Sequence, residues 1–206
     1  RLNRHGMDAV RGRPRFGEEH IAFHDPSGLT IEMTAAGDDA REPWVGTIPG
    51  ESAVRGLHSV TMLVRSPQKT IDLMTDVLGF SIIDEEDGRI RMAVSGTQPG
   101  HLIDILPDER AAPAKNGIGT VHHVALAIAG ADEQRVLRED LVRRGYQVTE
   151  VRDRHYFTSI YFREPGGVLF EVATRGPGFL IDEDLRSLGR ELRLPPGKEP
   201  RRTEIE

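Results

Sequence analysis

The sequence predicts an α+β fold built from tandem β-α-β-β-β modules, and three observations support this prediction. Residues 56–106 and 121–174 each show one strand pattern, one amphipathic helical segment and then three further strand patterns. The openings of these two stretches align at a constant offset, which places His122 on His58 (122 − 58 = 64). Residues 1–34 align without gaps with the end of the second stretch. We interpret these matches as duplication, with one partial and two complete modules in the chain.

The partial module is expected to hold the end of a helix and two strands. Gly6 suits the left-handed position that follows a helix, and the turn Asp25–Gly28 separates the two strand patterns. The second strand carries Glu32, which falls on Glu171 in the alignment (171 − 32 = 139). Because the front half of this module is missing and the first residue is Arg1 rather than Met, we expect an N-terminally incomplete sequence.

A linker is expected between the partial module and the complete ones. Residues 35–55 are polar, contain glycine and proline and show no hydrophobic period, as is typical of a segment between domains. A domain of paired modules is then expected over residues 56–175, with one helix beginning near Ser66 and Pro67 and another over 132–144. Its strands are expected at residues 57–64, 81–84, 89–94, 101–106, 121–128, 147–152, 155–163 and 168–174.

The last stretch, residues 176–206, is expected to form a terminal helix followed by a tail. Leu185, Leu188 and Leu192 recur at helical spacing within residues 182–192, so that they would share one apolar face. The charged residues after them show no such pattern, and we expect this end to fray.

Composition limits the classes of function. The 206 residues are 37% hydrophobic and 29% charged, as in a globular chain large enough to bury a core. The absence of cysteine excludes disulfides, zinc–thiolate sites and cysteine nucleophiles, so that a metal would need nitrogen and oxygen ligands. A formal charge of −6 argues against a nucleic-acid partner, and no apolar run reaches the roughly 18 residues of a membrane span. We therefore expect a cytoplasmic protein whose partners are small molecules.

Two adjacent histidines and one glutamate concentrate metal-ligand chemistry in the second complete module. His122 and His123 lie at the start of its first expected strand, and Glu171 lies in its last. Side chains alternate between the faces of a strand, so that only one histidine can point inward, and the apolar and small residues that follow favour His123. A buried carboxylate needs a partner, which for Glu171 is a metal or, alternatively, an arginine. The alternative for His123 is a buried histidine satisfied by hydrogen bonds.

These features resemble the vicinal oxygen chelate superfamily, in which a glutamate lies seven residues past the acidic residue of a (D/E)-P-x-G turn, as Glu171 does past Glu164. More narrowly, the segments TVHHVAL, SIYFREPGGVLFEVAT and RGPGFLIDEDLRSLGRELRLPP resemble the ring-cleaving dioxygenases that open hydroquinones. The resemblance covers essentially the whole chain and implies a cupped, mostly antiparallel sheet. It implies Fe(II), with Mn(II) as the alternative, held by His123 and Glu171. The third ligand would come from a first module that this chain does not contain.

The resemblance also implies roles around the substrate. Tyr161 and Arg154 match positions that contact a substrate hydroxyl and the developing negative charge, against the alternatives of a core aromatic and a surface charge. His122 would lie beside the metal ligands or point outward, and His58 would lie near the substrate or on the surface. Ser59 stands where catechol-cleaving relatives have a histidine ligand, a departure that disfavours the catechol type.

Together these implications predict a non-haem Fe(II) dioxygenase of the extradiol type that cleaves a hydroquinone-like aromatic ring with O2. One alternative is a glyoxalase-type metal-dependent isomerase or lyase, for which Glu32 would supply a second glutamate, although the dioxygenase interpretation gives Glu32 no metal. Another is a non-catalytic protein that binds a small aromatic compound, and a third is that the chain by itself is an inactive fragment. The expected partners are an aromatic substrate and O2, without nucleic acid or membrane, and a homo-oligomer is compatible with the sequence.

Overall fold

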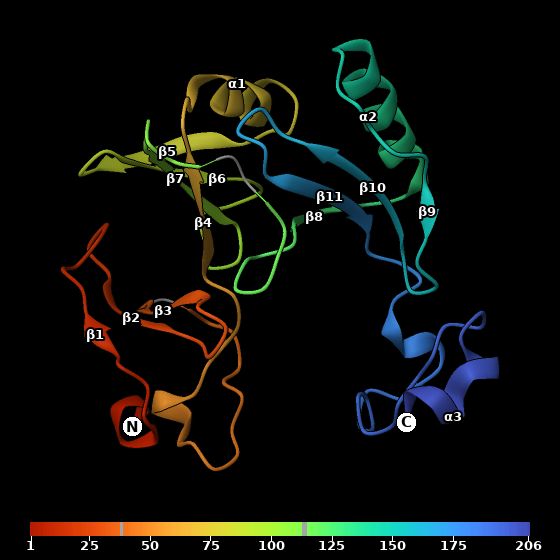
Figure 1. Cartoon of the computed structure of the whole chain (residues 1–206), viewed down its shortest axis with the longest axis horizontal. Coiled ribbons are helices and arrows are strands. Elements are labelled where there is room, and N and C mark those ends of the chain that lie inside the picture. Colours follow the sequence, from red (N-terminus) through yellow and green to blue (C-terminus); the bar gives the residue numbers. More distant parts are fainter. Residues whose placement is uncertain (38, 113–114) are drawn as a thin grey trace. The chain divides into compact units, whose positions relative to one another are not determined.

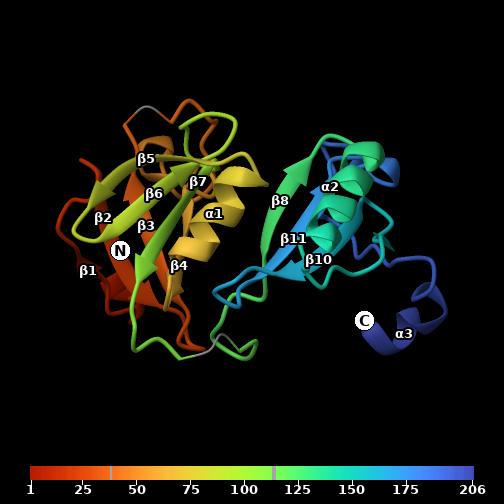
Figure 2. The ribbon, with the colours of Figure 1, turned by 90° about the horizontal axis from the view of Figure 1, so that it is seen from above.

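The structure is a computed structural model that describes residues 1–37, 39–112 and 115–206. Its elements form two compact units, which we describe separately (Figures 1 and 2). Unit 1 comprises Arg1–His122 and Glu164–Val168, and unit 2 comprises His123–Arg163 and Leu169–Glu206. Both units have few helices and mostly antiparallel strands, which confirms the predicted α+β class. Within the described ranges, no helix is both long and apolar enough to cross a membrane.

In unit 1, a short 3-10 helix and a three-stranded sheet correspond to the predicted partial module. The helix η1 (Leu2–His5) ends at Gly6, whose φ of 78° is the left-handed conformation expected there. The turn between the second and third strands is held by Asp25, whose Oδ1 accepts hydrogen bonds from the backbone N–H groups of Ser27 and Leu29, each at 2.8 Å. The antiparallel strands, in sheet order, are β1 (Val10–Arg11), β2 (Glu19–His24) and β3 (Thr30–Ala35).

The second sheet of unit 1 has the predicted β-α-β-β-β order. Its elements are β4 (Ser59–Val64), α1 (Gln68–Asp76), β5 (Ser81–Glu86), β6 (Arg89–Ala93) and β7 (Leu102–Pro107). The strands lie in the order β4-β7-β6-β5, with β4 parallel to β7. One face carries buried apolar side chains, among them Met62 and Ile105, and α1 adds Met74 to the core. Because alternate residues of a strand point to opposite sides, the other face carries Arg91 and Asp104.

Unit 2 repeats this arrangement. Its elements are β8 (Val124–Ile128), α2 (Ala131–Arg143), β9 (Arg152–Asp153), β10 (Thr158–Arg163) and β11 (Leu169–Thr174). The strand order is β8-β11-β10-β9, with β8 parallel to β11. Gln134 of α2 is fully buried and donates from Nε2 to the Val172 carbonyl at 2.8 Å, which ties the helix to one face of the sheet. The buried apolar side chains of this core include Val124, Leu141, Ile160, Phe162, Phe170 and Val172.

The strand predicted over residues 147–152 is largely absent, because only Arg152 and Asp153 form β9. The Thr149 backbone N–H donates to the Tyr161 carbonyl at 3.0 Å, but the Tyr161 N–H donates to the Thr149 side-chain hydroxyl at 3.1 Å. The Thr149 carbonyl accepts instead from Nε of Arg138 at 2.8 Å. Side chains thus take the places of the backbone partners that a regular ladder needs.

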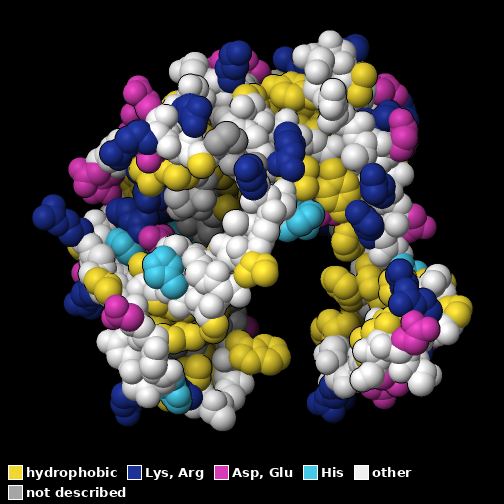
Figure 3. All heavy atoms as spheres, in the orientation of Figure 1, with side chains coloured by type: hydrophobic (Ala, Val, Ile, Leu, Met, Phe, Trp, Pro, Cys, Tyr) yellow, Lys and Arg dark blue, Asp and Glu magenta, His cyan; other side chains and the backbone are white. Residues whose placement is uncertain are grey.

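The helix predicted over residues 182–192 is wrong. The segment forms consecutive turns, and Gly189 has a φ of 76°, which interrupts right-handed helical conformation. Leu185, Leu188 and Leu192 are 75%, 41% and 45% exposed, so that the apolar stripe has no partner whose burial would stabilise a short helix. Figure 3 shows apolar side chains at the surface of this part of the chain.

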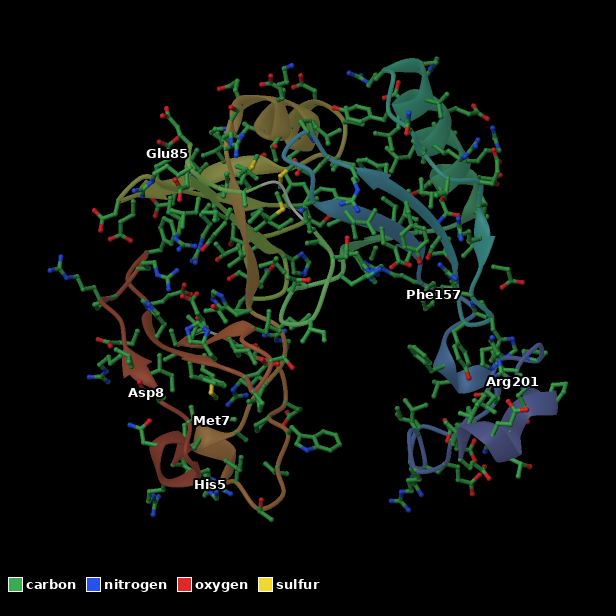
Figure 4. The ribbon with its side chains drawn as sticks, in the orientation of Figure 1. His5, Met7, Asp8, Glu85, Phe157 and Arg201 are labelled. Atoms are coloured by element: carbon green, nitrogen blue, oxygen red, sulfur yellow. The ribbon has the colours of Figure 1, made fainter. Side chains whose placement is uncertain are left out.

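The charged C-terminal end contains two short helices. Arg202 lies within hydrogen-bond distance of carboxylates on both sides, 2.7 Å from Glu199 and 2.8 Å from Glu206. Figure 4 labels the neighbouring Arg201. The helical elements of this end are η4 (Glu199–Arg201) and α3 (Arg202–Ile205), whereas η3 (Phe179–Ile181) lies before residues 182–192.

Candidate active site

In unit 2, the polar face of the sheet gathers three side chains of β10 and β11. Phe170 and Val172 are buried on the face toward α2, so that Glu171 between them points to the opposite face. Tyr161 is the antiparallel partner of Glu171, and Ser159 lies two residues before Tyr161 on the same face. The register therefore brings two hydroxyls and one carboxylate together.

The Glu171 carboxylate is buried, and both of its oxygens have partners. Oε1 accepts a hydrogen bond from the Tyr161 hydroxyl at 2.7 Å and another from Oγ of Ser159. Oε2 lies 2.7 Å from Nε2 of His123. These contacts offset the cost of removing the carboxylate from water. Its partners in the described part of the chain are hydroxyls and an imidazole, not the arginine that was the alternative from the sequence.

His123 lies immediately before β8, which was expected to begin at residue 121 and begins at Val124. Because β8 runs parallel to β11 with Val124 beside Phe170, the preceding residue lies beside the strand that carries Glu171. The His123 side chain is 34% exposed, and its ring meets the Tyr161 ring edge-on at a centroid distance of 6.2 Å. The imidazole thus reaches a buried carboxylate while part of it faces solvent, as an accessible ligand must.

A chain of hydrogen bonds leads from Arg154 to Glu171. Nε of Arg154 donates to the Tyr161 hydroxyl oxygen at 3.2 Å, and that hydroxyl donates to Glu171. The guanidinium carbon also lies 5.2 Å from the Tyr161 ring centroid, within cation–π range. Arg154 is held in the turn after β9, where its backbone N–H donates to the carbonyl of Phe157 at 2.9 Å (Figure 4). The Tyr161 hydroxyl therefore lies between a permanent cation and a carboxylate.

The pair of His123 and Glu171 fits two positions of a metal site. An imidazole nitrogen and a carboxylate oxygen are donors that Fe(II) and Mn(II) accept. With metal–ligand distances near 2.1 Å, two ligands of one ion lie roughly 3 Å apart, and Nε2 and Oε2 are 2.7 Å apart. Across the described ranges, no group of three or more His, Asp or Glu side chains is placed to hold a metal. The pair therefore supplies two ligands, and a bound ion would need more.

Comparison with known proteins identifies the family. Residues 56–172, more than half of the chain, match the sequence model of the Glyoxalase/Bleomycin resistance protein/Dioxygenase superfamily. The chain belongs to this superfamily. The matched range contains both candidate metal ligands as well as Arg154 and Tyr161.

Relatives within the superfamily are longer than this chain. MhqO of Bacillus subtilis strain 168, named a putative ring-cleaving dioxygenase, is 38% identical over 195 residues, which are 93% of this chain and 61% of MhqO. The chlorohydroquinone/hydroquinone 1,2-dioxygenase of Sphingobium indicum is 32% identical over 199 residues, which are 94% of this chain and 62% of that enzyme. A crystal structure of a Bacillus subtilis protein matches 99% of this chain and 65% of its own, with 35% identity and a TM-score of 0.89. The chain thus spans just under two thirds of these relatives.

In unit 1, the repeat matches Glu32 to Glu171. The surroundings of Glu32 are filled by ion pairs. Glu32, the repeat partner of the site glutamate, accepts a hydrogen bond from Nη2 of Arg15 at 2.5 Å. Arg91 donates to both oxygens of Asp104, at 2.8 and 3.1 Å, and to Glu18 at 2.7 Å. These five side chains line a cavity of about 10 Å³, the room of about one water molecule.

Two of the predicted site residues, His58 and His122, belong to unit 1. His58 belongs to unit 1, where Nε2 lies 2.9 Å from Oε1 of Glu18 and Nδ1 lies 3.0 Å from Oγ of Ser59. His122 is exposed, and its carbonyl accepts a hydrogen bond from Nδ2 of Asn116 at 2.6 Å. The predicted residues that the structure brings together are His123, Glu171, Tyr161 and Arg154.

Sequence reasoning missed Ser159, although its hydroxyl contacts the same carboxylate as Tyr161. Ser159 opens the segment SIYFREPGGVLFEVAT, but a serine carries no metal-ligand signal, so that it received no role. The available signal was its spacing, because a residue two positions before Tyr161 on a strand shares its face.

Proposed function

We propose that the protein carrying this chain is a non-haem Fe(II) dioxygenase of the extradiol type that opens a hydroquinone-like aromatic ring with O2. The observation that supports this most is the convergence of His123 and Glu171, with Nε2 and Oε2 2.7 Å apart, on the face that also carries Tyr161. The similarity to a chlorohydroquinone/hydroquinone 1,2-dioxygenase, at 32% identity, supports the same reaction class.

In this proposal His123 and Glu171 hold the metal, and a third ligand comes from outside the described residues. Fe(II), or Mn(II) as the alternative, would supply the redox chemistry that joins a diol to O2. The neutral imidazole and the single carboxylate leave the site with a net positive charge when a divalent ion is bound. Such a site attracts the deprotonated hydroxyl of an aromatic diol.

Tyr161 and Arg154 would act on the substrate's protons and charge. The Tyr161 hydroxyl can exchange its bond to Glu171 for a bond to a substrate oxygen, because a phenol is both donor and acceptor. Arg154, 3.2 Å from the Tyr161 oxygen, stabilises negative charge at that oxygen and beside it. The chain thus provides a proton at Oη of Tyr161 and a fixed cation next to it.

Oxygen uptake tests the proposal. The anaerobically purified protein carrying this chain, loaded with Fe(II), is expected to consume O2 when hydroquinone is added. The variants H123A and E171Q should lose uptake and bound iron together, because each removes one ligand. H24A is the matched control, since His24 is an exposed histidine of β2 in unit 1.

The other outcomes separate the alternatives. Failure to consume O2 with any aromatic diol would overturn the dioxygenase. Metal binding with turnover of a hemithioacetal and no O2 uptake would indicate a glyoxalase-type isomerase. Binding of an aromatic compound without any metal would indicate a non-catalytic binding protein.

A further inference from the structure

Ser159 makes a contact with the site that the motif did not indicate. We propose that Ser159 is a positioning residue, which fixes the Glu171 carboxylate with Oε2 toward His123 and thereby leaves the Tyr161 hydroxyl able to turn to the substrate. The proposal rests on the proposed function in so far as the carboxylate is a metal ligand. Three observations carry it.

The first observation is that two donors share one carboxylate oxygen. Ser159 Oγ and the Tyr161 hydroxyl both donate to Oε1 of Glu171, the latter at 2.7 Å. A carboxylate oxygen has about two lone-pair positions, so these donors saturate Oε1. Oε2, which faces His123, is the oxygen left to bind a metal. The carboxylate is therefore presented through one defined oxygen.

The second observation is that the two donors differ in accessibility. Ser159 is 0% exposed, and its hydroxyl donates to Glu171 inside the sheet face. Tyr161 is only partly buried, and its oxygen also accepts a bond from Arg154 near the surface. A substrate can thus reach the tyrosine hydroxyl but not the serine hydroxyl. Ser159 is the permanent donor, and Tyr161 is the exchangeable one.

The third observation concerns the carboxylate itself. The last torsion of a glutamate side chain has a broad, roughly two-fold preference, so that it does not hold one orientation without hydrogen bonds. If Tyr161 alone held Oε1, turning its proton to the substrate would leave a 4% exposed carboxylate partly unsatisfied and free to rotate. Ser159 prevents this, because its bond persists when that of Tyr161 is exchanged.

Two variants separate positioning from packing. Ser159→Ala removes the hydroxyl and little volume, opposite the small Ala173 on β11. Thr174→Val is the matched control, because it removes a second hydroxyl of the same sheet. The Thr174 hydroxyl accepts from the Thr158 N–H at 3.0 Å and donates to the Gly176 carbonyl at 3.0 Å, without touching Glu171.

Crystal structures of the metal-free variants supply a readout that is independent of any metal. In Ser159→Ala combined with Tyr161→Phe, where neither hydroxyl holds Oε1, the Glu171 carboxylate is expected to occupy more than one orientation, whereas in Tyr161→Phe alone and in Thr174→Val it should keep the wild-type orientation. A single wild-type orientation of Glu171 in the double variant, or more than one orientation in Tyr161→Phe alone, would overturn the proposal, whatever the metal affinity.

Mn(II) titration followed by electron paramagnetic resonance supplies the second readout. The dissociation constant should rise about tenfold in Ser159→Ala, as is usual for loss of a group that orients a ligand, and should not change in Thr174→Val. An equal rise in both variants would show a structural effect and overturn the proposal. If wild-type protein binds no Mn(II) while the carboxylate still turns in the double variant Ser159→Ala/Tyr161→Phe, the proposed function fails and the positioning role stands.

Discussion

Glu171 and Glu32 occupy equivalent positions of the repeat, yet the structure gives them different kinds of partner. Glu32 pairs with the permanent cation of Arg15 at 2.5 Å, and that pair satisfies its charge. Glu171 has two hydroxyls on one oxygen and the His123 imidazole near the other. When a metal ion binds the carboxylate, a neutral imidazole can bind the same ion through its ring nitrogen. A guanidinium cannot, because all of its nitrogens are donors. The identity of one neighbouring residue therefore separates a structural carboxylate from a candidate ligand.

Tyr161→Phe tests the proton-handling role at this scale. The change removes the hydroxyl between Arg154 and Glu171 but keeps the ring, so that folding should be preserved. We expect kcat for O2 consumption to fall by about 10²-fold, the usual contribution of a positioned acid or base, with iron still bound. Tyr156→Phe is the control, since the Tyr156 hydroxyl donates to Asp182 at 2.9 Å. A kcat within twofold of wild type in Tyr161→Phe would exclude the role.

At the scale of elements, the two acidic turns of the repeat share a design but differ in burial. Asp25 accepts two backbone N–H bonds in the turn between β2 and β3. Glu164, 139 residues later, accepts the Gly166 and Val168 N–H groups at 2.8 Å each in the turn between β10 and β11. Glu164 is 2% exposed and also accepts the hydroxyl of Thr70 on α1 at 2.6 Å. Within unit 1, this turn is therefore bound to α1.

Alanine substitutions test whether the buried acidic turn contributes more to stability than the exposed one. Glu164→Ala would leave two backbone N–H groups and a buried hydroxyl without acceptors, and should destabilise the protein by about 3 kcal/mol. Asp25→Ala, in the more exposed turn, allows water to replace the lost acceptor and should cost about 1 kcal/mol. Urea denaturation of both variants gives the comparison, and equal losses would contradict a special role for the buried turn.

Elements whose apolar periodicity has a surface to cover were predictable from the sequence, whereas the periodic leucines of residues 182–192 and the elements that depend on particular side-chain partners were misleading. The helix expected over residues 132–144 is α2, since its apolar face has a sheet to cover. The strand expected over residues 147–152 was lost because the Thr149 hydroxyl competes for the Tyr161 N–H. The site shows a similar division: Glu171 and Tyr161 were proposed from their motif, whereas the sequence offered for Ser159 only its spacing from Tyr161, and the register of β10 shows what that spacing means.

At the scale of the whole molecule, the two positions that the repeat matches, around Glu32 in unit 1 and around Glu171 in unit 2, differ in their chemistry. In unit 1, Glu18 of the three-stranded half bonds Arg91 of β6 at 2.7 Å and lies 2.9 Å from His58, so that charges join the two sheets. Arg91 also lies 4.1 Å over the Phe16 ring. In unit 2, the Glu171 carboxylate has hydroxyl and imidazole partners that a metal could replace. The carboxylates of unit 1 are thus held in ion pairs with arginines, whereas the Glu171 carboxylate of unit 2 is available as a candidate metal ligand.

This difference predicts an acid dependence for unit 1 that centres on Glu18. Burial acts to raise the pKa of Glu18, but the hydrogen bonds and charges of Arg91 and His58 outweigh burial, and the pKa lies below its ordinary value of 4.5. A carboxyl whose folded pKa is lowered stabilises the fold above its unfolded pKa, and that stability is lost as pH falls through the folded pKa. The contribution of Glu18 should therefore be complete at neutral pH and should fade below about pH 4.5.

Thermal unfolding from pH 7 to pH 3 tests this expectation. Glu18→Gln should lower the melting temperature at pH 7, because the amide removes the carboxylate that Arg91 shares with His58 and leaves Arg91 paired with Asp104, and the difference from wild type should shrink in acid as Glu18 itself becomes neutral. Glu150→Gln is the control, since that side chain is 88% exposed and pairs with Arg138 at the surface. A difference for Glu18→Gln that stays constant down to pH 3 would mean that packing, and not the carboxylate charge, holds the two sheets of unit 1 together.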